Sequence, residues 1–319
     1  MPNCLIGLGS NLGSRHEILE AAVRRLQGDP RIEIVGKSSW HTFPAIGGPS
    51  GQKDFLNGVL RLDTSLTPHE LAEVLQSVEC SLGRERSERW TARTLDCDLL
   101  LYGAQQINTP TLQIPHPRMM TRRFVLEPAA EIAAEMTHPS IGWSLGRLFE
   151  HLKSAPAYFA VTGSETAIVD RLARDLVARV NGRFIDGRSI LPSRSSRSAW
   201  HRQLEFARRR SWLLRKNGLD AKIDILPDES PRISNFWLWQ SLLSADASPV
   251  TQFDRHAKEL QWTNRAMTPK LLIVTDLETS EFGQALAAFE PELCVPTLHL
   301  SADPGDAIQD AVGAVLSMR

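Results

Sequence analysis

Short apolar runs alternate with helical periodicities along the first half of the chain, and this alternation constrains the fold more than any other feature. The run at 3–8 ends in a glycine-rich turn, after which Ile18 and Leu26 continue a helical spacing. A helix with Thr67 as its N-cap is also expected, together with strands at 32–39, 57–62 and 94–102. Interleaved strands and helices predict an α/β or α+β sandwich in which helices cover a sheet.

The same pattern starts again near residue 155, after a segment that contains Pro156. An apolar run at 158–162 leads through a turn into a helix from about 167 to 180. Further helices and strands are expected at 200–216, 236–243, 270–276, 296–300 and from Pro304 onward. Strands separated by long helices favour a parallel sheet. Because 319 residues exceed the usual size of one core, we expect two domains, at 1–155 and 156–319.

The composition excludes several classes of function. Lys and Arg number 36 against 37 Asp and Glu, so no overall field draws the chain to nucleic acid or acidic lipid. No stretch approaches the ~20 apolar residues that span a bilayer, and the start has no export signal. The cysteines show no zinc-ligand spacing and are expected as free thiols, at Cys4, Cys80, Cys97 and Cys294. We therefore expect a cytoplasmic protein without nucleic-acid or membrane partners.

Two carboxylates lie two residues apart on the strand expected at 94–102. Side chains at alternate positions of a strand project from the same face, so Asp96 and Asp98 should stand about 7 Å apart. Hard oxygen ligands on one rigid element suit Mg²⁺, which one or two carboxylates commonly hold while substrate phosphates complete its octahedron. The alternative is that both aspartates merely solvate an exposed strand face.

Basic and aromatic residues flank this pair in the sequence. Guanidinium groups bind phosphate oxygens and an indole can cover a flat ring, so the preceding stretch favours an anion beside a flat heterocycle. Its residues are Arg84, Arg86, Arg89, Trp90 and Arg93. Downstream, a loop broken by prolines is expected to hold His116, Arg122 and Phe124. Any single arginine could instead be a solvated surface residue.

Several separated motifs follow one another through the first half. They are LGSNLG at 8–13, FLN at 55–57, ERW-x-x-RTLD-x-D at 88–98, IPHPRM at 114–119 and R-x-F at 122–124. With these motifs, residues 3 to about 150 resemble the 6-hydroxymethyl-7,8-dihydropterin pyrophosphokinases of the folate pathway. The resemblance implies a ferredoxin-like α+β sandwich that transfers pyrophosphate from ATP to the hydroxymethyl group of the pterin.

The resemblance implies roles for the charged residues. Asp96 and Asp98 match the aspartates that hold two Mg²⁺ ions bridging the ATP phosphates, and they count as catalytic together with Arg84 and Arg93. The remaining positions that line the nucleotide match Glu79, His116 and Arg122, and those of a mobile catalytic loop match Arg86 and Trp90. ATP is then the co-substrate and Mg²⁺ the cofactor.

Four further residues match the family's pterin site. Phe55 and Phe124 match the aromatics that sandwich the ring, and Thr42 and Asn57 match polar groups at its edge. A pterin is flat, apolar on its faces and polar at its edge, so stacking plus amide hydrogen bonds is a sensible way to bind it. Phe55 and Asn57 are two apart on a strand and can meet face and edge together. The alternative is one core phenylalanine and one turn asparagine.

The implied reaction is an attack of the hydroxymethyl oxygen on the β-phosphorus of ATP, with AMP leaving. The protein must chiefly align the groups and neutralise charge. A pair of metal ions can also lower the pKa of the attacking hydroxyl, so no dedicated general base is expected. Thr91 and Ala92 replace the Gly and Pro of the usual RWGPRT signature, and Pro117 follows His116, which leaves the rate of loop closure open.

The second half carries a turn where a phosphate loop would lie. The turn TGSE at 162–165 leads into a helix, but the GxxxxGK[ST] pattern and its lysine are missing. Segments at 198–216, 268–278 and 295–303 give residues 155–319 a loose resemblance to deoxynucleoside kinase-like P-loop kinases. We expect a parallel-sheet domain that has lost its own phosphate-transfer site.

Three hypotheses follow for the whole chain. It is an active pterin pyrophosphokinase with a degenerate partner domain that could form a homo-oligomer, a nucleoside kinase with an appendage, or a non-catalytic sensor of pterin and ATP. Residues 183–216 hold ten Lys or Arg against two acidic residues, as an anion surface or a solvated helix face. Release of AMP from ATP in the presence of the pterin distinguishes the first hypothesis from the others.

Overall fold

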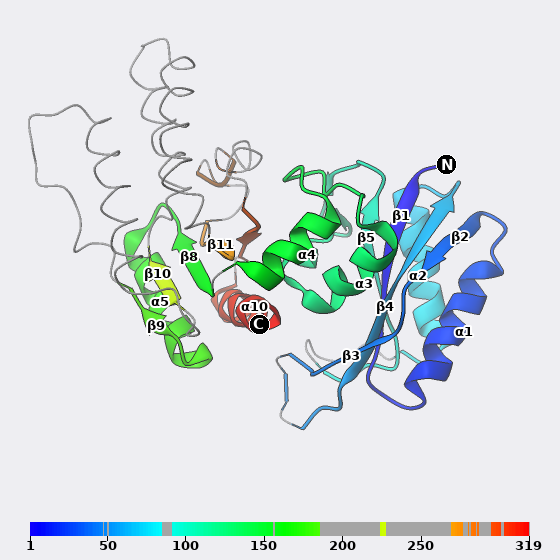
Figure 1. Cartoon of the computed structure of the whole chain (residues 1–319), viewed down its shortest axis with the longest axis horizontal. Helices are drawn as coiled ribbons and strands as arrows, with labels where there is room; N and C mark the ends of the chain where they lie inside the picture. Colours follow the sequence, from blue (N-terminus) through cyan, green and yellow to red (C-terminus); the bar gives the residue numbers. More distant parts are fainter. Residues whose placement is uncertain are drawn as a thin grey trace, which may run out of the picture. The chain divides into compact units, whose positions relative to one another are not determined.

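The computed structural model shows an α/β protein whose described residues form two compact units. Unit 1 comprises Met1–Lys153 with Leu316–Met318, and unit 2 spans Ser154–Val315 (Figure 1). The structure describes residues 1–46, 48–49, 51–84, 91–155, 157–185, 224–227, 269–276, 280, 282–284, 286, 295–300 and 303–318. Outside them lie the helices expected at 200–216 and 236–243, and Arg86, Arg89, Trp90 and Cys294. None of the helices in the described ranges has the length and apolar character needed to cross a membrane.

Unit 1 is built on one antiparallel sheet. Its strands are β1 (Asn3–Ser10), β2 (Ile32–Lys37), β3 (His41–Phe43), β4 (Phe55–Thr64) and β5 (Asp96–Tyr102). They follow the order β2-β4-β1-β5, and β3 pairs with β4. Two helices, α1 (Arg15–Gln27) and α2 (Pro68–Ser81), connect β1 to β2 and β4 to β5. With the short β3 set aside, the chain order is βαββαβ on an antiparallel sheet, which is that of a ferredoxin-like sandwich.

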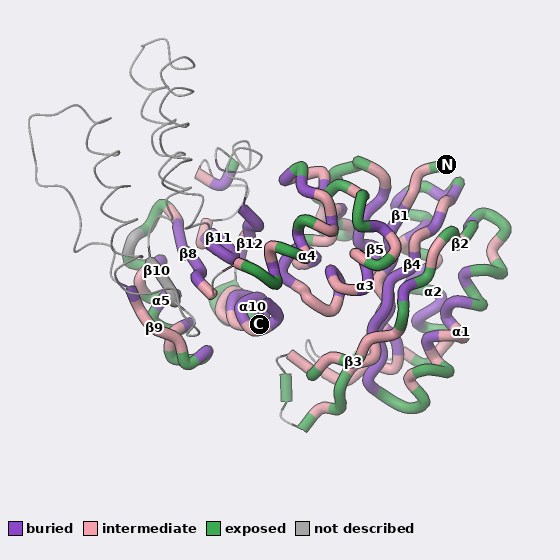
Figure 2. Tube along the Cα trace, viewed as in Figure 1, coloured by how far each residue is buried: buried purple, intermediate pink, exposed green. Residues whose placement is uncertain are grey.

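The core of unit 1 lies between this sheet and the pair α1 and α2. Cys4, Ile6 and Leu8 occupy alternate positions of β1 and are buried against the helices (Figure 2). The same buried cluster includes Leu19, Leu26, Leu71 and Leu75 from the two helices. Apolar burial contributes ~25 cal/mol per Å², so this cluster stabilises the unit.

The start of α2 shows how local sequence sets an element boundary. Thr67 Oγ1 accepts a hydrogen bond from the N–H of Glu70, and the Glu70 carboxylate accepts one from the N–H of Thr67 at 2.7 Å. Pro68 at the first helical position needs no N–H partner. The helix ends at Ser81, and Gly83 follows with a φ of 82°. This capping box confirms the predicted helix start and contributes about 1 kcal/mol.

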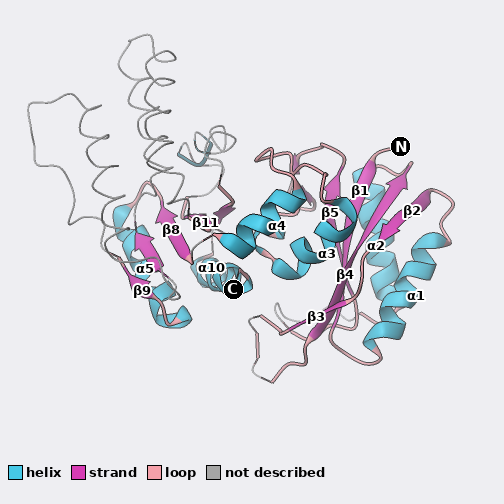
Figure 3. Cartoon of the chain, viewed as in Figure 1, coloured by secondary structure: helices cyan, strands magenta, loops and turns pink. Residues whose placement is uncertain are grey.

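A third helix, α3 (Arg123–Ala133), covers the opposite face of the sheet (Figure 3). Arg122 precedes this helix and Phe124 lies in its first turn, so the loop predicted to hold Phe124 was wrong at this end. The apolar residues Leu126 and Ala129 follow at helical spacing and are buried, which stabilises the helix despite the prolines upstream. The other elements of unit 1 are β6 (Ile107–Asn108), β7 (Gln113–Ile114), η1 (Met119–Thr121) and α4 (Leu145–Ser154).

Unit 2 contains a parallel sheet. Its described elements are β8 (Tyr158–Thr162), α5 (Thr166–Val180), β9 (Arg183–Phe184), β10 (Asp224–Pro227), β11 (Leu271–Val274), β12 (Thr297–His299) and all but the last two residues of α10 (Pro304–Ser317). The strands follow the order β12-β11-β8-β10-β9, and every neighbouring pair is parallel, which confirms the predicted sheet type. Strands β9 and β10 were not predicted, because two and four residues are too short to show a period.

A buried histidine in unit 1 links pH to stability. His138 is 2% exposed, and its N–H donates to the Trp143 carbonyl at 2.8 Å. Within the described part of the chain its Nδ1 has no hydrogen-bond partner. Burial lowers the pKa of His138 to about 4, against ~6.5 in an unfolded chain. The unfolded state therefore binds the proton more readily, and stability falls as the pH drops from about 6.5 toward 4.

We predict that His138 lowers the free energy of unfolding by about 2 kcal/mol between pH 7.5 and pH 5. Urea unfolding at both pH values measures this difference in the parent and in His138→Gln. The substitution should reduce the pH dependence by nearly that amount, whereas the contribution of other histidines is the same in both proteins. An equal pH dependence in parent and variant would contradict the assignment.

Candidate active site

Asp96 and Asp98 lie on β5 opposite two glycines of β1. The antiparallel register pairs Gly9 with Asp96 and Gly7 with Asp98. Both aspartates therefore lie on the α3 face of the sheet, while Cys97 between them packs toward the core on the other face. Because glycine has no side chain, neighbouring side chains lie close to the sheet beside the two carboxylates, Asn57 at Gly9 and Leu100 at Gly7. The register thus gives this pair the shared strand face that the sequence predicted.

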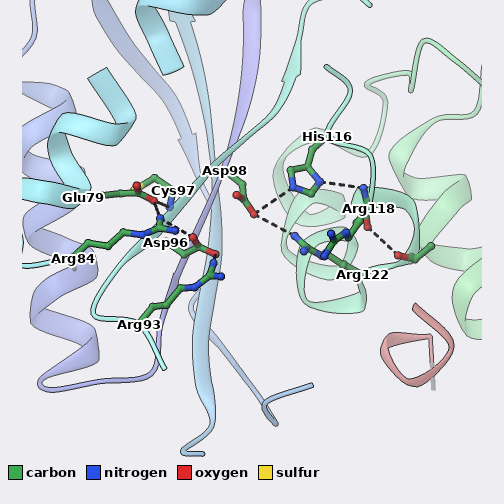
Figure 4. Close-up of polar contacts among 10 residues, drawn as sticks. Glu79, Arg84, Arg93, Asp96, Cys97, Asp98, His116, Arg118 and Arg122 are labelled. Carbon is green, nitrogen blue, oxygen red and sulfur yellow. Dashed lines mark hydrogen bonds and ion pairs between the residues drawn. The ribbon is translucent and has the colours of Figure 1, made fainter. Parts of the chain in front are cut away.

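Two arginines hold the carboxylate of Asp96, one at each oxygen (Figure 4). Arg84 Nη1 lies 2.8 Å from Oδ1, and Arg93 Nη1 lies 2.8 Å from Oδ2. Arg84 also pairs with Glu79, whose Oε1 accepts a hydrogen bond from the N–H of Cys97 at 2.7 Å. The structure therefore brings Glu79, on α2, together with Arg84 and Arg93, from the connection between α2 and β5, around one carboxylate.

Burial and like charge raise two pKa values in this cluster. Burial raises the pKa of Glu79 to about 7, against the opposing effects of the Cys97 N–H and Arg84. Burial, and then the charge of Asp98, raises the pKa of Asp96 despite its two arginine contacts. When burial and like charge make it unfavourable for neighbouring carboxylates to be negative together, a bound cation stabilises their charged forms strongly. This electrostatic environment favours a divalent metal ion.

Asp98 has a separate pair of partners (Figure 4). Arg122 Nη1 lies 3.2 Å from its Oδ2, and His116 Nε2 lies 3.8 Å from the same oxygen. His116 Nδ1 accepts a hydrogen bond from the N–H of Arg118 at 3.1 Å, so the neutral ring carries its hydrogen on Nε2. Burial, and then nearby arginines, lowers the pKa of His116 to about 3. His116 is therefore a neutral hydrogen-bond donor near pH 7.

Phe55 and Asn57, at the start of β4, lie on the same face of the sheet as the carboxylates. A Cβ atom added to Gly9 would lie 2.8 Å from Asn57 Oδ1 and 3.9 Å from Phe55 Cδ1, so the bare glycine makes room for the amide. In the ladder, Asn57 pairs with Gly9 on one side and with His41 on the other. One row across four strands therefore contains His41, Asn57, Gly9 and Asp96.

Phe124 lies beside Phe43, which is on this face of the sheet and was not predicted as a site residue. Phe43 pairs with Phe55 between β3 and β4, and its ring centroid lies 6.3 Å from that of Phe124. The ring of His41 stacks on Phe43 at 6.1 Å, and Arg122 Cζ lies 5.4 Å from the centre of the Phe124 ring. Phe43 and His41 are two residues apart, the same spacing as in the FLN motif, so strand alternation could have identified them.

The register turns Thr42 toward the opposite face. Thr42 pairs with Leu56, so its exposed side chain points away from the face of Phe55 and Asn57. Only its main chain remains available for the pterin-edge role that the resemblance implied. Phe43 occupies the site face instead.

The donor set suits a metal that arrives with a substrate. Among the described residues, no three His, Cys, Asp or Glu side chains converge as a complete metal site. Mg²⁺ is commonly bound by one or two carboxylates and completes its shell with water and substrate phosphates. Asp96 and Asp98 on one strand face, with basic groups beside them, meet that requirement.

A family model described as 7,8-dihydro-6-hydroxymethylpterin-pyrophosphokinase matches residues 5–134. A 2-amino-4-hydroxy-6-hydroxymethyldihydropteridine pyrophosphokinase from Synechocystis sp. is 39% identical over 161 residues, which cover 50% of this chain and 82% of that protein. The chain belongs to this family. The match confirms the resemblance of the N-terminal half, whereas the kinase resemblance of the second half is not confirmed.

Other relatives agree with this family assignment. Proteins of the same name from Pseudomonas aeruginosa and Bacillus subtilis are 40% and 43% identical, over 42% and 41% of this chain and 82% and 78% of their own length. A crystal structure of Plasmodium falciparum HPPK-DHPS with pteroate aligns with 99% of this chain and 79% of its own. Its TM-score of 0.37 at 12% identity is too low to support an inference.

We predict that Gly9→Ala displaces the Asn57 amide, because the added methyl would lie 2.8 Å from Asn57 Oδ1. The Michaelis constant for the pterin should rise about tenfold, a change of ~1.4 kcal/mol, with little effect on the constant for ATP. Gly36→Ala is the matched control, because a Cβ atom there meets its nearest neighbour at an ordinary 3.5 Å. Equal pterin constants in the two variants would argue against Asn57 as a pterin contact.

Proposed function

We propose that the α3 face of the unit 1 sheet binds ATP beside Asp96 and the pterin beside Asn57. As a member of its family, the chain transfers pyrophosphate from ATP to the hydroxymethyl group of 6-hydroxymethyl-7,8-dihydropterin in folate biosynthesis. The observation that carries the site assignment is the row that joins Asn57 to Asp96 through Gly9. Strands ~4.8 Å apart separate these two residues by about 10 Å, a span that a pterin and a phosphate chain can bridge.

Two Mg²⁺ ions are assigned to Asp96 and Asp98. Carboxylate oxygen is a ligand that Mg²⁺ prefers, and both side chains share one face of β5. Bound ions would neutralise phosphate charge and lower the pKa of the attacking hydroxyl. For that reason no residue of the chain is assigned as a general base. The two carboxylates already pair with arginines, so a metal ion that binds them would take the place of these arginines and leave them to pair with phosphate.

The basic groups around the aspartates are assigned to the ATP phosphates. Arg84, Arg93 and Arg122 each contact one of the two carboxylates, so short side-chain movements bring them to phosphate oxygens nearby. Neutral His116 can donate a hydrogen bond from Nε2 without adding charge. Glu79 orients Arg84 through their ion pair. Positioned cations and donors are the main protein contribution to phosphoryl-type transfer.

The pterin is assigned to the aromatic end of the row. Phe55 and Phe124 would cover its two faces, with Phe43 as a wall between them, because Phe43 neighbours both. The Asn57 amide offers a donor and an acceptor to the ring edge, and the main chain of Thr42 is assigned to the same edge. The hydroxymethyl oxygen then forms a bond to the β-phosphorus, the bridging oxygen leaves with AMP, and the hydroxyl proton passes to solvent.

Unit 2 is assigned as a partner domain without phosphate transfer. Its strand β8 runs through Gly163 and Ser164 into α5, the position at which a phosphate loop joins strand to helix. The lysine of such a loop is missing from the sequence. Ser164 donates its N–H to Asp276 at 2.8 Å and its hydroxyl to the same carboxylate, so these donors already have an anionic partner. These contacts support a degenerate kinase-like domain, and its homo-oligomer stays a prediction.

We predict that Asp96→Ala lowers AMP release at least ~100-fold, the usual scale for losing one electrostatic contact in a transition state. AMP is measured after incubation with ATP, Mg²⁺ and the hydroxymethyl dihydropterin, with urea unfolding to verify the fold. Asp29→Ala is the matched control, since Asp29 also pairs with an arginine, Arg31, at 2.7 Å. Undiminished turnover in Asp96→Ala would refute the metal assignment, and a parent that binds both substrates without releasing AMP would support the sensor hypothesis.

We also predict that the chain has no nucleoside kinase activity. With ATP, Mg²⁺ and each common deoxynucleoside, the parent should release no ADP above the level without nucleoside, because unit 2 lacks the phosphate-loop lysine. Asp96→Ala is assayed in parallel, because any nucleoside-dependent ADP release that it retains would not come from the pterin pyrophosphokinase site. Nucleoside-dependent ADP release that survives this substitution would revive the nucleoside kinase hypothesis.

A further inference from the structure

We propose that Asn11 is a positioning residue that couples the ATP side of the site to the pterin side. The proposal rests on the site assignment given above, because it concerns Arg93 on one side and the segment leading to Phe55 on the other. Asn11 directly follows β1, is fully buried, and makes hydrogen bonds to both of these segments. It acts through the residues that it holds in place.

On the ATP side, Asn11 holds the backbone of Arg93. The Arg93 N–H donates to Asn11 Oδ1 at 2.7 Å, and the Asn11 N–H donates to the Arg93 carbonyl at 3.1 Å. Two hydrogen bonds between the same two residues fix both the position and the direction of the chain before β5. The Arg93 guanidinium reaches Asp96 from this point, so Asn11 determines where that cation is placed.

On the pterin side, Asn11 holds the chain that leads into β4. Its Nδ2 donates to the Lys53 carbonyl at 3.3 Å and to Gln52 Oε1 at 3.4 Å. Lys53 lies two residues before Phe55, the first residue of β4. A movement of the Asn11 amide therefore shifts the start of the strand that carries the pterin-facing residues.

Asparagine suits this position because one side chain supplies an acceptor and two donors. Its removal would break two partly buried hydrogen bonds, one with the Arg93 N–H and one with the Lys53 carbonyl, each worth about 1 kcal/mol. An aspartate would keep the acceptor for the Arg93 N–H, but its second oxygen would face the Lys53 carbonyl and repel it. Asn11→Ala should therefore release both segments, and Asn11→Asp the pterin side alone.

The hydrogen bonds of Asn11 to the Arg93 and Lys53 backbones make ATP binding and pterin binding depend on each other. Phosphates that order Arg93 also fix Asn11, and the fixed amide holds Lys53 in the position that presents Phe55. Coupling between two sites is reciprocal in free energy. A bound nucleotide should thus tighten pterin binding, and Asn11 should carry that effect.

The test measures pterin affinity with and without nucleotide. 6-Hydroxymethylpterin is titrated by its fluorescence, alone and with saturating Mg²⁺ and α,β-methylene-ATP, whose α–β bridge cannot be cleaved. The ratio of the two dissociation constants should be about tenfold or more in the parent and near one in Asn11→Ala and Asn11→Asp. Ser10→Ala is the matched control, since Ser10 is equally buried but its hydroxyl bonds within the same turn, to the Leu12 carbonyl at 3.4 Å. It should keep the parent ratio.

A ratio that stays at the parent value in both Asn11 variants would overturn the proposal, and so would a parent ratio of one. The measurement compares two states of one protein, so a loss of stability alone does not change it. If Asn11→Ala fails to fold, Asn11→Asp carries the test. Failure of the proposed function is distinguishable, because the parent would then release no AMP from ATP and the pterin.

Discussion

The antiparallel pairing of β1 with β4 and with β5 holds the strand-borne residues of the site in register. Backbone hydrogen bonds align Asn57, Gly9 and Asp96, which are distant in sequence, into one row. Alternation along β1 gives this strand two tasks, because Ile6 and Leu8 face the helices while Gly7 and Gly9 face the site. Core and site are therefore built from the same strands, and the stability of one fixes the geometry of the other.

Charge compensation is the second condition that the site meets. Partly buried carboxylates are unfavourable unless positive groups lie beside them, and Asp96 and Asp98 each have arginine partners. The same arginines are assigned to the phosphates of ATP. Binding then replaces one set of ion pairs by another, so the site needs little net change in charge. Neutral His116 offers a hydrogen-bond donor at Nε2 where another cation would upset this balance.

Local patterns predicted much of unit 1, whereas long-range contacts escaped them. The periodicities identified β1, α1, β4, α2 and β5, and the Asp96 and Asp98 pair, because each depends on neighbours within a few residues. The contacts of Asn11 join residues 82 and 42 positions apart, so no local pattern contains them. The face on which the Thr42 side chain lies could not be predicted, because the register of a three-residue strand is set by its partner β4. In unit 2, the parallel sheet was predictable from spacing, but β10 is too short to recognise.

The alternation of β1, β4 and β5 also limits how such a chain can change in length. Inserting or deleting one residue within any of these strands would exchange its two faces beyond that point. Gly9 would give way to a core side chain, and a leucine would replace a carboxylate beside the substrates. Changes in length are therefore tolerable only in the connections, such as residues 28–31 between α1 and β2, where no ladder fixes the orientation of successive residues.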